Sequence, residues 1–227
     1  MSPVYLVPGW AYPASAMTPL QEALNDCGFT EVMITSAEAL PVTGPPALLI
    51  GWSLGGVQAL RHALAHPACC RHCVLISSTP KFCCPPDHSF PGQPPGAVNV
   101  MLRGLPRNRR LVLENFFRKS AAPKRLADEA LNRRIDDIAS TPTEALTEGL
   151  QILLDTDLRN QLQSAPFPVL ALHGEEDQII PSQVLTAWPD LMPGCETWLD
   201  AETGHELVLD QSARVARTIT QAVENTR

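Results

Sequence analysis

Three residue types spread along the chain could together perform nucleophilic catalysis. Ser53 lies in the pentapeptide Gly51-Trp52-Ser53-Leu54-Gly55, which has the spacing G-x-S-x-G. A serine hydroxyl is a weak nucleophile at neutral pH, so it needs a neighbouring base, and that base needs an acid to orient it. Asp177 and His205 lie far downstream and are candidates for the acid and the base. The chemistry that such a set supports is acyl transfer through a covalent ester on the serine.

The residues around Ser53 predict a strand, a sharp turn and a helix. An apolar run over 47–50 predicts a buried strand, and apolar residues at helical spacing over 57–64 predict the helix. Gly51 and Gly55 suit a turn in which two backbones pass closely, because a Cβ at either position would clash. The turn would lift the hydroxyl of Ser53 clear of the sheet. The alternative is a serine with a structural role in a turn.

The loop after the apolar run 169–172 carries the candidates for the orienting acid. This run predicts a buried strand, and Asp177 lies five residues past its end. At that spacing a carboxylate can face the crevice above the carboxyl edge of a parallel sheet. The spacing favours Asp177. Glu175, Glu176 and Asp200 remain alternatives, as does an exposed acidic loop without a role in catalysis.

Six histidines compete for the role of the base. His205 follows the last predicted strand, and we expect Gly204 to free the backbone so that His205 can turn inward. His173 directly follows a strand and is expected to be a packed turn residue. The remaining histidines lie on the helix after Ser53 or in loops rich in cysteine and proline: His62, His66, His72 and His88.

Acyl transfer also needs two N–H donors for the oxyanion that develops on the substrate. The backbone N–H of Leu54, at the start of the predicted helix, is one candidate. The second should come from the loop after the first strand, where Gly9 and Trp10 lie. The indole of Trp10 would then form a wall of the acyl pocket, and a tryptophan that only packs in the core is the alternative.

The order of elements predicts an α/β fold with a mostly parallel, doubly wound sheet. Strands are expected at 3–7, 30–34, 47–50, 73–77, 169–172 and 196–199. Thr18 and Gln21 predict a capping box at the start of the first helix. The alternation stops over 81–165, where helices are predicted at 109–120, 124–140 and 143–154. We therefore expect a core of residues 1–80 and 166–227 and a helical lid inserted at 81–165.

Composition restricts the class of protein. The net charge of −7 and the isoelectric point near 5.3 argue against general nucleic-acid binding. The first residues lack the pattern of a secretory signal, and no apolar run reaches the roughly 18 residues of a spanning helix. We expect a cytoplasmic monomer that contacts no membrane and needs no cofactor. Cys70 and Cys73 have the spacing of half a zinc site, but buried thiols are the expected state and no metal is predicted.

With these residues in view, the chain resembles the α/β-hydrolase superfamily, and within it the pimeloyl-acyl-carrier-protein methyl ester esterases of biotin synthesis. The likeness covers most of the chain and is carried by these motifs: Leu6-Val7-Pro8-Gly9-Trp10, Gly51-Trp52-Ser53-Leu54-Gly55-Gly56, Leu113-Glu114-Asn115-Phe116-Phe117, Gly149-Leu150-Gln151-Ile152-Leu153-Leu154, Thr156-Asp157-Leu158-Arg159 and Gly204-His205. Two departures stand out. Pro8 replaces a histidine that is usual in the family, and the leading antiparallel strands of the superfamily are missing, so a smaller sheet is expected.

The resemblance implies the activity and the residues that perform it. It implies a serine carboxylesterase with Ser53 as nucleophile and with Asp177 and His205 as its partners. Trp10 and Leu54 would be the oxyanion donors. It also implies that Phe116 and its neighbours Phe117 and Ser120 line the channel for the pimeloyl chain. The substrate would be the methyl ester of a pimeloyl group that is carried by an acyl carrier protein.

The charge of the predicted lid agrees with a carrier-protein partner. Residues 81–134 hold eleven Lys or Arg and four Asp or Glu, although the whole chain is acidic. A basic lid suits an acidic carrier protein that presents its acyl arm. A solvated face whose cations pair with Asp136 and Asp137 is the alternative. Other functions remain open: a general short-chain esterase or acyl-transferring enzyme without a carrier partner, a catalytically silent binding module of the same fold, and a zinc-binding protein.

Overall fold

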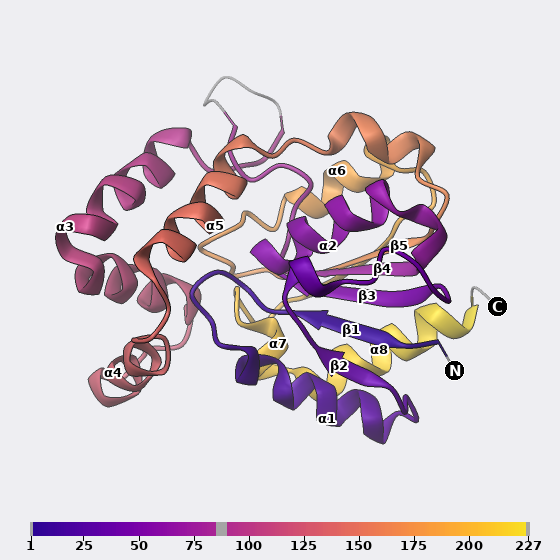
Figure 1. Ribbon diagram of the computed structural model, residues 1–227, viewed down its shortest axis with the longest axis horizontal. Coiled ribbons are helices and arrows are strands. Elements are labelled where there is room, and N and C mark those ends of the chain that lie inside the picture. The colour runs from indigo at the N-terminus through magenta and orange to yellow at the C-terminus, as the bar shows by residue number, and fades with distance from the viewer. Residues whose placement is uncertain (1, 85–89, 226–227) are drawn as a thin grey trace.

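A single sheet of six parallel strands forms the centre of the computed structural model, which describes residues 2–84 and 90–225 (Figure 1). The strand order is β2-β1-β3-β4-β5-β6, and every neighbouring pair is parallel. The strands are β1 (Val4–Val7), β2 (Val32–Ile34), β3 (Ala47–Trp52), β4 (Cys70–Ile76), β5 (Val169–Gly174) and β6 (Glu196–Asp200). The predicted parallel α/β sheet is confirmed.

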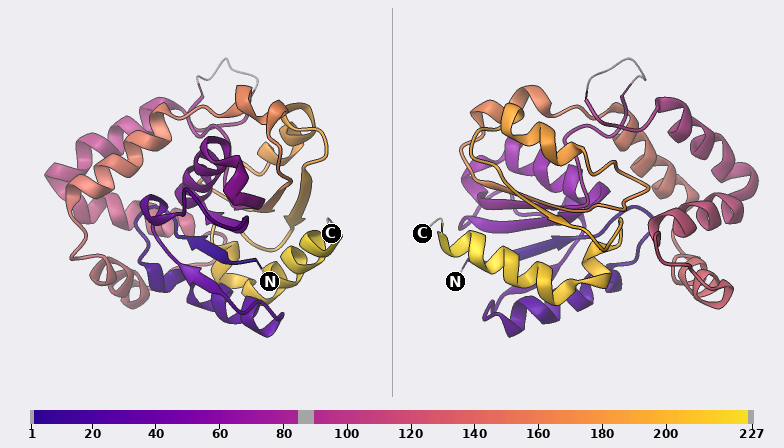
Figure 2. Two further views of the ribbon diagram at one scale, coloured as in Figure 1. Left: turned by 45° about the vertical axis from the view of Figure 1, so that its right-hand side comes forward. Right: turned by 180° about the vertical axis from the view of Figure 1, so that it is seen from behind.

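Helices cover both faces of the sheet and its carboxyl end. The α-helices are α1 (Thr18–Asp26), α2 (Leu54–Ala65), α3 (Pro95–Ser120), α4 (Asp128–Asp137), α5 (Thr143–Asp155), α6 (Val184–Leu191), α7 (Leu207–Asp210) and α8 (Ser212–Asn225). The short 3₁₀ helices are η1 (Ala14–Met17), η2 (Ala37–Ala39), η3 (Pro67–Cys69) and η4 (Arg159–Ser164). Helices α2 and α6 lie on one face of the sheet, and α1 and α8 lie on the other (Figures 1 and 2). In the described residues, no helix is both long and apolar enough to cross a membrane.

The central strands are buried along their whole length, which explains their continuous apolar sequences. All six residues of β3 and all six of β5 are buried. Strands covered by helices on both faces cannot alternate between apolar and polar residues. Two apolar clusters form as a result, one between the sheet and α2, α5 and α6, and the other between the sheet and α1, α7 and α8.

The chain between β4 and β5 contains α3, α4, α5 and η4, and its three α-helices lie beyond the carboxyl end of β1 (Figure 1). Helix α3 begins at Pro95, well before the predicted start at 109, because a proline is well tolerated in the first turn of a helix. It bends at Asn108, whose φ of −153° and ψ of 71° are not helical. Helix α4 is shorter than the predicted 124–140.

The two ends of this inserted segment are tied together. Lys81 and Asp157 form an antiparallel bridge, and their side chains form an ion pair of 2.9 Å. The backbone N–H of Leu158 donates to the carbonyl of Pro80 at 3.0 Å. Arg159 also binds the carboxylate of Asp157, at 2.8 Å. The hydrogen bond from Arg159 and the nearby Lys81 hold the pKa of Asp157 below its usual range.

Two further local predictions were wrong. The capping box at Thr18 does not form, because η1 runs directly into α1 and Thr18 is already helical, with Met17 at the N-cap. The amide of Gln21 instead donates to the carbonyl of Val32 in β2, at 2.7 Å. Strand β4 begins at Cys70, three residues before the predicted start, because it pairs with β3 from Ala47 onward.

Candidate active site

Ser53 lies at a strained turn between β3 and α2. Its φ of 55° and ψ of −121° are unusual for a residue with a side chain. A Cβ on Gly51 would overlap the carbonyl oxygen of Gly55, and a Cβ on Gly55 would overlap that of Val7. The glycines of the G-x-S-x-G motif are therefore required by close backbone contacts. The turn places the Ser53 side chain at the carboxyl end of the sheet.

His205 joins Ser53 to Asp177 through two hydrogen bonds. Nε2 of His205 lies 2.9 Å from Oγ of Ser53, and Nδ1 lies 2.8 Å from Oδ2 of Asp177. The side chains of His205 and Asp177 are completely buried. Because a carboxylate only accepts hydrogen bonds, Nδ1 carries the hydrogen and Nε2 is free to accept the serine hydroxyl. The three side chains thus have the geometry of a nucleophile, a base and an orienting acid.

The loop after β5 holds the Asp177 carboxylate in place. Oδ1 of Asp177 accepts from the backbone N–H groups of Ile179 at 2.7 Å and Ile180 at 2.9 Å. Burial alone would raise the pKa of Asp177. The positive charge that His205 can carry, and the hydrogen bonds from His173 and His205, hold this pKa well below its usual range instead. The acid therefore stays ionised at neutral pH.

His205 is positioned by the loop after β6 and by Trp52. The indole N–H of Trp52 donates to the carbonyl of His205 at 2.9 Å. Gly204 does not have the positive φ that backbone freedom would require, so the expected reason for this glycine was wrong. A Cβ at Gly204 would overlap the carbonyl oxygen of Ala122, which precedes α4. The glycine is needed because the inserted segment packs directly against the histidine loop.

The other histidines are distributed over three places. His62 on α2 and His66 just past its end have tilted rings with centroids 4.8 Å apart, and His72 is buried in β4. His88 lies outside the described residues. His173 is buried as predicted, but it lies within β5 rather than in a turn after it, and its ring reaches the carboxylate of Asp177, a contact that the sequence did not indicate.

The loop after β1 approaches Ser53 closely. A Cβ built on Gly9 would lie 3.3 Å from the Cβ of Ser53. In the described part of the chain, the backbone N–H groups of Trp10 and Leu54 have no protein acceptor. Both groups therefore remain available to an oxygen bound beside Ser53, as an oxyanion site requires.

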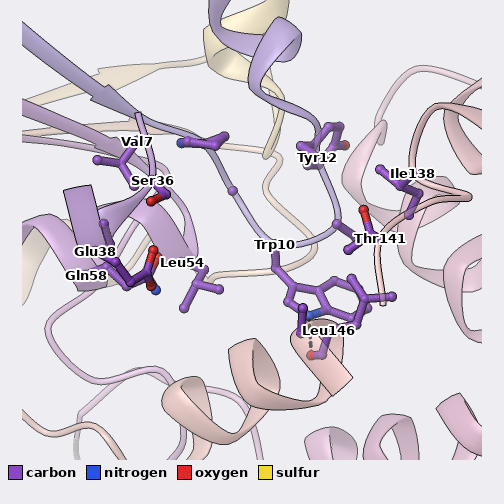
Figure 3. Close-up of a pocket in the computed structure, with 15 residues that line it drawn as sticks. Val7, Trp10, Tyr12, Ser36, Glu38, Leu54, Gln58, Ile138, Thr141 and Leu146 are labelled. Atoms are coloured by element: carbon purple, nitrogen blue, oxygen red, sulfur yellow. Dashed lines mark hydrogen bonds between the residues drawn. The ribbon is translucent and has the colours of Figure 1, made fainter. Parts of the chain in front are cut away.

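The Trp10 side chain is fixed by α5 (Figure 3). Its indole N–H donates to the carbonyl of Leu146 at 2.8 Å, and its ring meets the ring of Phe116 edge-on at 4.8 Å. Trp10 and Leu54 line a cavity of about 190 Å³, to which Pro8 also contributes. Gln58 and Glu38 give this cavity a polar side (Figure 3).

The predicted channel residues lie next to one another. Phe116 contacts Trp10, its ring centroid is 5.4 Å from that of Phe117, and the ring of Phe117 packs edge-on against Tyr12 at 5.4 Å. The hydroxyl of Ser120 is completely buried and lies 2.9 Å from that of Tyr12. Phe116, Phe117 and Ser120 are not among the residues that line the cavity beside Trp10 and Leu54, so their role in a substrate channel stays a prediction.

Tyr12 belongs to a buried polar cluster that the sequence analysis missed. Its hydroxyl donates to Glu206 at 2.6 Å, and Arg134 of α4 binds both carboxylate oxygens of Glu206. Burial and the neighbouring Glu206 raise the pKa of Tyr12 well above its usual value. No motif marks these residues, and the only signal is the position of Glu206 directly after His205.

The cysteines lie mostly in the core. Cys70 and Cys73 are both buried in β4, and burial raises the pKa of the Cys70 thiol to about 12. Burial likewise raises the pKa of Cys83 to about 11. In residues 2–84 and 90–225, no group of three or more histidine, cysteine or acidic side chains is arranged to hold a metal ion.

A parallel sheet with a sharp serine turn at its carboxyl end and with helices on both faces is the architecture of an α/β hydrolase. The family model described as alpha/beta hydrolase fold matches residues 40–212, and the chain belongs to this family. Together with the esterase relatives described in the next paragraph, membership of this family identifies the chain as a carboxylic ester hydrolase.

Two curated relatives carry the same name. The chain is 30% identical over 203 residues to the pimeloyl-acyl-carrier protein methyl ester esterase of Shewanella woodyi, covering 82% of this chain and 78% of that protein. The enzyme of that name from Shewanella oneidensis is 29% identical over 202 residues, which cover 81% of this chain and 77% of the relative.

Solved structures with the same fold include an esterase from Exiguobacterium antarcticum, with a TM-score of 0.81 and 18% identity. The match covers 99% of this chain and 92% of the esterase. A hydrolase from Oleispira antarctica has a TM-score of 0.82 and 12% identity, with 99% and 92% of the two chains covered. At these identities the likeness supports the fold alone.

Proposed function

We propose that this protein hydrolyses the methyl ester of a pimeloyl group carried by an acyl carrier protein, with Ser53 as nucleophile. The observation that carries the proposal is the pair of hydrogen bonds from His205, at 2.9 Å to Ser53 and 2.8 Å to Asp177. The names of the Shewanella relatives support the choice of substrate.

The reaction follows from the positions of these groups. Oγ of Ser53 attacks the ester carbonyl carbon while its proton moves to Nε2 of His205, and Asp177 stabilises the imidazolium. The oxyanion is bound by the N–H groups of Leu54 and Trp10. Collapse of this intermediate expels methanol, which takes the proton from His205. Water, activated by His205, then attacks the acyl ester, and Ser53 recovers its proton as the acid departs.

In the same proposal, residues 81–165 form a lid and its cations receive the carrier protein. Five lid cations are exposed and form no ion pair in the described part of the chain. They are Arg103, Arg107, Lys119, Arg125 and Arg133. Among the described residues, the ion pairs of the lid do not involve Asp136 or Asp137, which weakens the alternative of a solvated face neutralised by these residues.

Replacement of Ser53 tests the catalytic assignment. We expect Ser53→Ala to lower kcat for methyl and p-nitrophenyl esters at least about 10⁴-fold, because no other group can form the acyl-enzyme. Mass spectrometry after treatment with a fluorophosphonate should find the label on Ser53. Wild-type hydrolysis by Ser53→Ala, or a label elsewhere, would show that the assignment is wrong.

The carrier partner is tested by neutralising the five exposed lid cations to glutamine together. KM for pimeloyl-carrier methyl ester should rise about tenfold at low salt, because rim charges mainly guide association. KM for free dimethyl pimelate should not change. The control replaces Arg61 and Arg217, two exposed cations outside the lid, with glutamine. If both esters respond alike, or if the wild type hydrolyses both with equal kcat/KM, the protein is a general esterase.

A further inference from the structure

His173 occupies a position beside the proposed acid that the mechanism above does not use. It lies in β5, and its side chain is almost completely buried. Its Nε2 is 3.1 Å from Oδ2 of Asp177 and 3.0 Å from the carbonyl oxygen of Ile180. The same carboxylate oxygen accepts from His205 at 2.8 Å. Two imidazoles therefore share one oxygen of Asp177.

The surroundings determine which nitrogen of His173 carries the hydrogen. A carbonyl oxygen and an ionised carboxylate can only accept, so Nε2 must be protonated to be compatible with both. Nδ1 of His173 is buried and has no hydrogen-bond partner in the described residues. A buried N–H without an acceptor is costly, so Nδ1 carries the lone pair. The ring is thus a neutral donor aimed at Asp177.

We propose that His173 is a positioning residue that orients the Asp177 carboxylate for His205 and moderates the charge it presents. This inference rests on the proposed esterase mechanism. The backbone N–H of Ile180 donates to Oδ1 of Asp177 while its carbonyl accepts from His173, so one imidazole contacts both the carboxylate and a residue that supports it. With two N–H donors on each oxygen, the carboxylate cannot rotate without losing hydrogen bonds.

Removal of this donor should affect the base as well as the fold. A second N–H on Oδ2 withdraws negative charge from the contact with His205. Without it, Asp177 would stabilise the protonated form of His205 more strongly, and the acidic limb of the kcat/KM profile would move to higher pH. The other charged groups nearby are either paired or exposed. They are Glu206 with Arg134, Asp200 with Arg214, and the exposed Glu175 and Glu176.

The kinetic test compares His173→Phe, which keeps the ring volume, with His173→Gln, which keeps an N–H donor. We expect His173→Phe to lower kcat about tenfold and to move the acidic limb of the kcat/KM profile up by about half a pH unit. His173→Gln should restore kcat to within about threefold of the wild type. It should also return the acidic limb of the kcat/KM profile to its wild-type pH. The control is His72→Phe, because His72 is also buried but lies in β4. It should leave both quantities unchanged. Equal losses in the Phe and Gln variants with an unmoved limb would overturn the proposal.

A second measurement does not depend on any variant folding or on ester hydrolysis. ¹⁵N NMR shifts of the wild-type imidazoles distinguish a ring nitrogen that carries hydrogen from one that does not. We expect His173 to carry hydrogen on Nε2 and not on Nδ1 at neutral pH. The opposite tautomer would overturn the proposal even in an active enzyme. If the wild type hydrolyses no ester, the proposed function fails, while the tautomer still decides the role of His173.

Discussion

Ser53 stores backbone strain that its neighbours must offset. A non-glycine residue with φ of 55° and ψ of −121° costs about 1–3 kcal/mol. The structure compensates with hydrogen bonds on both sides of the residue. The N–H of Ser53 donates to Ile76 of β4 at 2.9 Å, and its carbonyl accepts from the hydroxyl of Ser78 at 2.7 Å. The hydroxyl of Ser53 is therefore held in place by the sheet rather than by a flexible loop.

Single residues differed in how far the sequence could indicate them. Ser53 and Asp177 follow strongly apolar strands, whereas His205 follows the mostly exposed β6, and parallel strands bring such loops to one edge. The structure places all three within hydrogen-bonding distance. Tyr12 and Glu206 are 194 residues apart, and Arg134 and Glu206 are 72 apart. Such pairs leave no periodic pattern, so only coordinates reveal them.

At the scale of elements, α5 supports the loop that carries Trp10 through a glycine in its centre. A Cβ on Gly149 would lie 2.7 Å from Cδ1 of Trp10 and 2.9 Å from Cδ2 of Leu54. Both neighbours belong to the proposed oxyanion donors. We expect Gly149→Ala to lower kcat/KM about tenfold by displacing them. It should also lower Tm by a few degrees, since overpacking of about 1–3 kcal/mol exceeds the gain of about 1 kcal/mol in helix propensity.

Gly96→Ala is the matched control for this prediction. Gly96 lies in the first turn of α3, and an added Cβ would meet nothing within 4 Å. The kcat/KM of the Gly96→Ala variant should equal that of the wild type, and its Tm should not fall. Thermal melts and steady-state kinetics on both variants suffice. A Gly149→Ala variant with wild-type kcat/KM would show that the contact between α5 and the oxyanion loop does not affect catalysis.

The sequence predicted those elements correctly whose residue types are determined mainly by burial. The central strands are buried on both faces, and their continuous apolar runs indicated them correctly. The start of α3 was missed because a segment with many prolines and glycines favours a loop, although Pro95 fits the first turn of a helix. The capping box at Thr18 failed because local capping residues could not reveal that η1 continues into α1.

At the scale of the whole molecule, the inserted segment and the sheet share one apolar core. Leu105, Leu113 and Phe117 of α3 belong to the same buried cluster as Leu49 of β3 and Ala171 of β5. Polar contacts across the boundary add to this packing. They are Trp10 with Leu146, Arg134 with Glu206 and Lys124 with Asp210. A division of the chain at 81 and 165 therefore does not separate two hydrophobic cores.

This shared core predicts that the segment 81–165 and the sheet unfold together. Loss of the helices in this segment would expose the apolar side of the sheet and leave the buried carboxylate of Glu206 without Arg134, which costs several kcal/mol. Differential scanning calorimetry should show one transition whose calorimetric and van't Hoff enthalpies agree. Tryptophan fluorescence and far-UV circular dichroism should report the same midpoint, since Trp10 lies between the two parts. An early loss of helical signal, with a second transition at higher temperature, would show that the segment over 81–165 is an independent unit.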